Sequence, residues 1–152
     1  MFERVLVGYD GSAGSRRACT AAAEIAARFH SVLTVIVVRP PGKGGADLYL
    51  ESLVPVGESG TALDAVIEEL RTRAVAHGAQ RVESVLLQGE VPEAILEWLQ
   101  ANPQELVVVG SRGLSRGRRL LLGSVSSELV AKAPCPVLVI RSTHDHRPTG
   151  PH

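Results

Sequence analysis

The stretch Glu105–Ser127, which reads ELVVVGSRGLSRGRRLLLGSVSS, decides the fold of this chain. Its first part, Leu106–Val109, is a short β-branched apolar run and predicts a strand that is buried on both faces. Three glycines and two arginines follow in Gly110–Gly117 and predict a loop. Gly123–Ser127 then reads as the start of a helix with hydroxyls near its N-cap. Backbone N–H groups converge at such a helix start, and the helix dipole adds roughly half a positive charge, so the stretch predicts an anion site.

The bulk composition limits the class of protein. The length of 152 residues fits one domain. Sixteen basic and sixteen acidic residues give a net charge of zero, which argues against nucleic acid or a membrane surface as partner. No apolar run approaches the roughly 18 residues of a membrane span, and Met1–Arg4 leads directly into a predicted strand, so we expect a cytoplasmic protein. Cys19 and Cys135 lie far apart without a metal-binding pattern, which favours two free thiols and no metal site.

Strand-like apolar runs alternate along the chain with segments of helical periodicity. Strands are predicted at 5–9, 32–38, 81–87, 106–109 and 137–140, with a helix in each of the four intervals. Either Asp10 or Ser12 is expected to cap the first helix, whose many alanines predict close packing on a sheet. This order predicts one α/β domain over 1–141, with a parallel sheet covered by helices on both faces. Residues 39–60 are predicted to form a loop or lid, and 142–152 a disordered tail.

The carboxyl ends of the predicted strands should share one rim, where parallel sheets bind their ligands. The residues at these ends are Gly8, Tyr9 and Asp10, then Val38, and then Gly110 with its loop. Familiar phosphate loops are absent from the sequence, since it contains neither G-x-x-x-x-G-K-[ST] nor a G-x-G-x-x-G after the first strand.

The spacing Gly110-x2-Gly113-x9-Gly123-Ser124, between a strand and a helix, resembles the nucleotide loop of the universal stress protein family. Three further segments resemble the family in order and spacing, and the resemblance covers essentially residues 3–141. These segments are Val5–Ser12, Arg119–Ser126 and Ala133–Arg141.

The resemblance implies a Rossmann-like fold of the adenine nucleotide alpha hydrolase type, with a five-stranded parallel sheet of order 3-2-1-4-5. It also implies ATP and a homodimer through the strand Val137–Ile140. A Mg²⁺ ion could bridge the phosphates of ATP, although no pair of carboxylates provides a dedicated site for it. Carried over by position, Asp10 would accept from the ribose hydroxyls, and the main chain of Val38 would recognise adenine. Val109 and Gly110 would line the ribose and adenine. The phosphates would be surrounded by Gly113, Gly123, Ser124, Val125 and Ser126.

Alternative roles stay open for several of these residues. Ribose binding is the favoured role of Asp10, and the alternative is a helix cap; for Ser124 and Ser126 the alternative is an N-cap. Arg112, Arg116, Arg118 and Arg119 form a basic cluster that is either solvated or turned to phosphate, and Arg112, inside the first glycine pair, is the favoured contact.

No general base or Walker-type lysine is evident, so no catalytic residue is predicted and ATP hydrolysis is expected to be slow or absent. Two other functions fit the same scaffold. One is a sensor of AMP or cyclic AMP, and the other is a structural dimer that binds no nucleotide. An adenylating or sulfurating enzyme of a related fold is disfavoured, because residues 10–15 read DGSAGS instead of a Ser-Gly-Gly-x-Asp-Ser loop.

Overall fold

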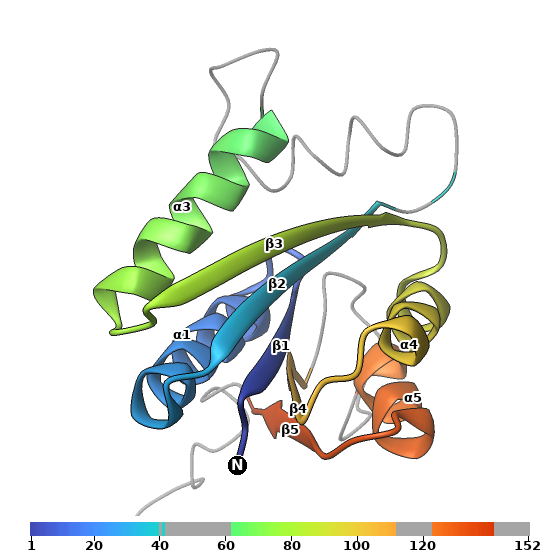
Figure 1. Cartoon of the computed structure of the whole chain (residues 1–152). Coiled ribbons are helices and arrows are strands. Elements are labelled where there is room, and N and C mark those ends of the chain that lie inside the picture. The colour runs from blue at the N-terminus through green and yellow to red at the C-terminus, as the bar shows by residue number, and fades with distance from the viewer. Residues whose placement is uncertain (40, 42–61, 112–122, 142–152) are drawn as a thin grey trace, which may run out of the picture.

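The computed structural model describes residues 1–39, 41, 62–111 and 123–141, and these form a single parallel sheet with helices on both faces (Figure 1). The strands are β1 (Arg4–Tyr9), β2 (Val32–Arg39), β3 (Arg81–Gln88), β4 (Leu106–Gly110) and β5 (Val137–Ile140). Their order across the sheet is β3-β2-β1-β4-β5, and every pairing is parallel. The predicted α/β class and strand order are therefore confirmed.

Helices cover the two faces of the sheet in pairs. α1 (Ala13–Phe29) and α3 (Ala62–Ala76) lie on one face, and α4 (Val91–Ala101) and α5 (Ser124–Lys132) lie on the other (Figure 1). Ala18 and Ala22 of α1 are fully buried, which confirms the close packing that the alanine-rich sequence predicts. Small side chains let the helix axis approach the sheet, so that β-branched residues of β1 and β4 fill the remaining space.

Two core clusters lie on opposite faces of the sheet because side chains alternate along each strand. Val5, Val7 and Tyr9 of β1 pack in the cluster under α1 and α3. Leu6 packs in the cluster under α4 and α5, together with Ile95 of α4 and other strand residues. Burial on both faces explains why the central strands read as continuous apolar runs.

The strand register places the ends of β1, β2 and β4 side by side. Tyr9 of β1 pairs with Val37 of β2, and Val7 pairs with Val108 of β4. Continuing this register by one to three residues puts Asp10 level with Val38 on one side and with Ser111 on the other. Neighbouring strands are about 4.8 Å apart, so these positions form one row. The sheet order reverses between β1 and β4, which is where α/β sheets open their ligand crevice.

Several strands extend one residue beyond the predicted ends, since β2 includes Arg39, β3 includes Gln88 and β4 includes Gly110. β5 lies at an edge of the sheet, as predicted. Most of the predicted loop 39–60, the centre of the glycine loop and the tail lie outside the described residues. Across the described ranges, no helix has the length and apolar content needed to cross a membrane.

Candidate functional site

The start of α1 is closed by its own side chains. Ser12 is the N-cap, and its Oγ accepts a hydrogen bond of 3.1 Å from the N–H of Ser15. The Ser15 hydroxyl donates to the Ser12 carbonyl (3.0 Å) and accepts from the N–H of Asp10 (3.3 Å). Ser12 is therefore the cap, and the alternative that Asp10 caps the helix is wrong.

Asp10 takes a different role at the end of β1. Its Oδ1 accepts a 2.9 Å hydrogen bond from the N–H of Ser12, across a turn in which Gly11 has a φ of 82°. A glycine suits this turn because other residues rarely adopt a positive φ. The half-buried carboxylate is thereby held in one orientation at the rim of the sheet.

The start of α5 is built differently. Its N-cap is Gly123, which has no side chain to cap the helix, and the first helical bond runs from the Ser127 N–H to the Gly123 carbonyl at 3.0 Å. Helix geometry leaves the N–H groups of Ser124, Val125 and Ser126 without an intrahelical acceptor. These three donors and the positive end of the helix dipole make this helix start a suitable anion site.

The Ser126 hydroxyl is turned into the protein. It lies 3.1 Å from the carbonyl of Ser111 and 3.1 Å from that of Gly123, and Ser126 is 2% exposed. A hydroxyl has one hydrogen to donate, and here both nearby acceptors belong to the backbone. The hydroxyl of Ser126 is thus engaged by the backbone, whereas its N–H group faces the same open helix start as those of Ser124 and Val125.

The two helix starts are in contact through glycines. A Cβ added to Gly110 would lie 2.6 Å from the carbonyl carbon of Gly14 and 3.0 Å from the nitrogen of Ser15. Only glycine therefore lets the end of β4 pack against the first turn of α1. The sequence carries no sign of this contact, because the two glycines are almost a hundred residues apart.

The other predicted site residues differ in which of their groups are exposed at the carboxyl ends of the strands. The side chains of Val38 and Val109 are buried under α4 and α5, so their main-chain groups are what remains at the rim. The side chain of Tyr9 is buried on the opposite face of the sheet, in the cluster with α1. A Cβ on Gly8 would meet Val109 Cγ1 at an ordinary 3.5 Å, so protein packing does not require that glycine. Arg112 and Gly113 lie outside the described residues.

Ser111 is a residue of the site that the sequence did not single out. Its N–H donates to the Ile140 carbonyl (2.9 Å), and its own carbonyl accepts from the N–H of Gly123 (2.5 Å). The residue is 1% exposed, and its Oγ has no hydrogen-bond partner among the described residues. A serine that follows a strand carries no signal of this role, because the partners come from distant segments.

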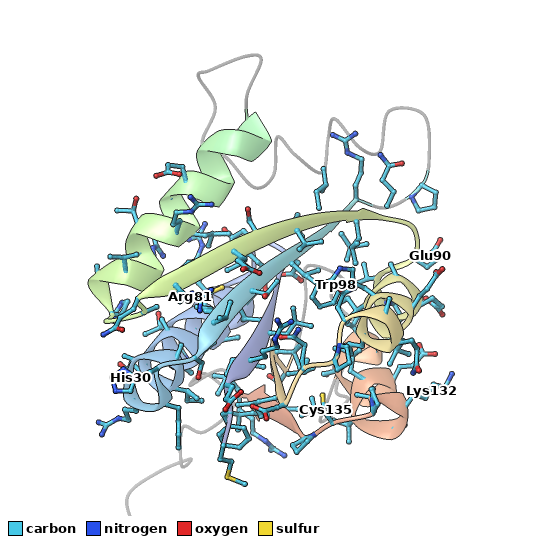
Figure 2. All side chains as sticks on the ribbon, viewed as in Figure 1. His30, Arg81, Glu90, Trp98, Lys132 and Cys135 are labelled. Carbon is cyan, nitrogen blue, oxygen red and sulfur yellow. The ribbon has the colours of Figure 1, made fainter. Side chains whose placement is uncertain are left out.

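The two cysteines lie in different parts of the fold, Cys19 in α1 and Cys135 just before β5. Burial raises the pKa of the Cys19 thiol to about 12, and partial burial also raises the pKa of Cys135. Cys135 precedes β5 and thus lies at the amino end of the sheet, whereas Glu90 follows β3 at the carboxyl end (Figure 2). Both thiols are free.

In the part of the chain that the structure describes, no three His, Cys, Asp or Glu side chains are grouped closely enough to hold a metal ion.

Comparison with known proteins gives consistent results. The model of the universal stress protein family matches residues 1–141. A universal stress protein of Thermus aquaticus is 38% identical over 144 residues, which span 93% of this chain and 100% of the relative. The crystal structure of a universal stress protein in complex with cAMP matches with a TM-score of 0.74 and 28% identity, over 91% of this chain and 97% of that one. Universal stress protein UspA of Lactobacillus plantarum also gives a TM-score of 0.74 at 28% identity, over 92% and 98%.

Proposed function

Because this chain belongs to the universal stress protein family, we propose that it binds an adenine nucleotide, with ATP as the preferred ligand, at the carboxyl ends of β1 and β4. The observation that carries this proposal is an anchored carboxylate, Asp10, at the end of β1, together with a helix start after β4 whose N-cap is the glycine Gly123. A nucleotide needs both, since its ribose offers hydroxyl donors and its phosphates need N–H donors.

Each part of the nucleotide has a complementary group in the chain. The N–H groups of Ser124, Val125 and Ser126 would donate to phosphate oxygens, and Gly123 keeps the approach to them unobstructed. Asp10 would accept from the ribose hydroxyls. Main-chain groups of Val38, in the same row of the sheet, would recognise the edge of adenine. The favoured further phosphate contacts are Arg112 and Gly113, which lie outside the described residues.

The nucleotide would be held more for sensing than for turnover. Any Mg²⁺ would be carried by the phosphates, because the described residues contain no group of carboxylates suited to a metal. The sequence also lacks the P-loop lysine that assists phosphoryl transfer in many ATPases. We therefore expect slow ATP hydrolysis or none, in a cytoplasmic protein that acts in stress response or signalling.

AMP or cyclic AMP is the second candidate ligand. It is favoured by the relative whose structure contains cAMP and which is 28% identical to this chain. A nucleotide with a single phosphate would contact Asp10 and Val38 in the same way as ATP. It would gain less binding free energy from the N–H groups at the start of α5. The order of affinities therefore separates a triphosphate site from a monophosphate site.

A homodimer through β5 is also proposed. This four-residue strand lies at the sheet edge, and Leu138 is 36% exposed. Such an edge leaves backbone N–H and C=O groups available for a second copy of the strand. Sedimentation or light scattering tests this, and a monodisperse monomer at micromolar concentration would contradict it.

Calorimetric titration with ATP, ADP, AMP and cyclic AMP tests the ligand assignment. Asp10→Ala should abolish most of the affinity, and Asp10→Asn, which keeps the acceptor for the Ser12 N–H, separates loss of the charge from loss of the turn. Gly113→Ala tests the glycine loop. Unchanged ATP affinity in both alanine variants would overturn the site assignment, and long incubation followed by product analysis measures hydrolysis.

A further inference from the structure

A cluster of backbone and hydroxyl hydrogen bonds joins the end of β4 to the start of α5. The Ser111 carbonyl accepts from the N–H of Gly123 at 2.5 Å and from the hydroxyl of Ser126 at 3.1 Å. Ser111 itself is fixed on the sheet, because its N–H donates to the carbonyl of Ile140 at 2.9 Å. The hydroxyl of Ser126 thereby ties the first turn of α5 to Ser111, which is itself bonded to the edge strand β5 through its N–H.

This arrangement fixes the helix start from inside. A side-chain cap, such as Ser12 provides for α1, would occupy an N–H group of the first turn. Ser126 instead uses carbonyl acceptors, including that of its own N-cap Gly123 at 3.1 Å, and it does so while almost fully buried. The Ser126 hydroxyl therefore holds the first turn of α5 in place without itself occupying any of the three N–H groups of that turn.

Two contacts connect this cluster to the turn that carries Asp10. Ser111 follows Gly110, and Gly110 packs against Gly14 in the first turn of α1. The loop that carries Asp10 is bonded into that same turn through the Asp10 N–H and the hydroxyl of Ser15. A displacement of α5 at Ser126 would consequently change the spacing between its N–H groups and the Asp10 carboxylate.

We infer that Ser126 is a positioning residue for the phosphate half of the nucleotide, acting through its buried hydroxyl and not by contact of that hydroxyl with the ligand. This inference rests on the proposed function, because it assumes an adenine nucleotide at this crevice. On this inference, the protein prefers a phosphorylated nucleotide to the bare nucleoside because Ser126 positions the N–H groups of α5. The binding of ribose and adenine by Asp10 and Val38 does not depend on Ser126.

The test compares ATP with adenosine, each measured by competition with a fluorescent ATP analogue. Ser126→Ala should lower the affinity for ATP about tenfold, the effect of losing one buried hydrogen bond that orients charged contacts, and leave adenosine unchanged. Ser126→Thr keeps the hydroxyl and should restore most of the ATP affinity. Ser127→Ala is the matched control, since Ser127 is the next residue of the same helix and is exposed.

Each outcome bears on the inference. Wild-type affinity for ATP in Ser126→Ala contradicts it, and so does an equal loss for ATP and adenosine, which would indicate a general structural role. Failure of Ser126→Thr to recover ATP affinity with an unchanged melting temperature also overturns it. If Ser126→Ala does not fold, Ser126→Cys provides a similar volume with a weak donor for the same comparison. A wild-type protein that binds neither compound refutes the proposed function instead.

Discussion

The starts of α1 and α5 both have a serine whose hydroxyl bonds to the N-cap carbonyl, and they differ in the N-cap residue itself. At α1 the N-cap is Ser12, and its hydroxyl accepts a hydrogen bond from the N–H of Ser15. At α5 the cap is a glycine, and the buried hydroxyl of Ser126 bonds to carbonyl groups. The cap at α1 therefore takes up the N–H of Ser15, whereas no side chain among the described residues caps the corresponding N–H of Ser126.

The difference shows that hydroxyl content alone does not identify an anion site. A serine at the N-cap satisfies a donor that a phosphate would need, so capping and anion binding compete for the same N–H groups. The residue that decides between them is the N-cap itself, Ser12 in one case and Gly123 in the other. The contact of Gly110 with Gly14 brings the end of β4, which leads towards α5, against the first turn of α1.

The largest expected effect on stability comes from a substitution that forces the end of β4 away from the start of α1. Gly110→Ala would place a Cβ 2.6 Å from the backbone of Gly14, so the strand and helix must move apart. We expect a loss of about 3 kcal/mol in the free energy of unfolding, measured by urea denaturation. Gly8→Ala is the control, because its Cβ would meet Val109 at an ordinary distance, and its cost should stay near 1 kcal/mol. Equal costs in the two variants would show that the Gly110 contact is not tight.

Giving α5 the kind of cap that α1 has should convert an open start into a closed one. Gly123 has φ −67° and ψ 164°, which other residues adopt freely, so Gly123→Asp and Gly123→Asn should both cap the helix. Each should raise the free energy of unfolding by a few tenths of a kcal/mol. ATP affinity, measured by calorimetry, should fall in both and further in the aspartate variant, because its carboxylate repels phosphate. Undiminished ATP affinity in Gly123→Asp would contradict an anion site at α5.

Opening the start of α1 should have the smaller, purely structural effect. Ser12→Ala removes the acceptor for the Ser15 N–H and should cost about 1 kcal/mol of stability by thermal or urea unfolding. ATP affinity should change less than in Gly123→Asp. A larger loss of affinity in Ser12→Ala would mean that the phosphates lie against α1 instead.

The smallest effect of ATP is expected in the middle of α1, at Cys19. Burial raises the pKa of Cys19 to about 12, so its thiolate is scarce at neutral pH and its reaction with a thiol reagent should become faster as pH rises towards that value. Cys135 is partly exposed and should react first. Saturation with ATP should leave the rate at Cys19 unchanged, as expected for a helix that only supports the site. Mass spectrometry of the labelled peptides measures both rates, and fast labelling of native Cys19 would contradict its burial.

Local patterns in the sequence predict the fold well. The five apolar runs and the helical spacing between them identify every strand and helix of the described sheet, and the resemblance to a known family supplies the strand order. The ends of strands differ by one residue at Arg39, Gln88 and Gly110, because pairing with a neighbouring strand extends each run beyond its apolar residues.

The candidate site is only partly predictable in the same way. Asp10 and Gly123 follow from their positions at a strand end and at a helix start. The inward hydroxyl of Ser126 and the contact between Gly14 and Gly110 do not, because each depends on how segments distant in the sequence pack. The burial of Tyr9 on the far face follows from strand alternation, since Val5 and Val7 share that face.

The most direct measurement is the change in backbone amide shifts when the nitrogen-labelled protein is titrated with ATP and, separately, with adenosine. We predict that the N–H signals of Ser124, Val125 and Ser126 move with ATP and stay in place with adenosine. The signals of Ala13–Ser15 should move little with either ligand. Equal shifts at the two helix starts, or ATP shifts confined to α1, would contradict the assignment of the phosphates to the open start of α5.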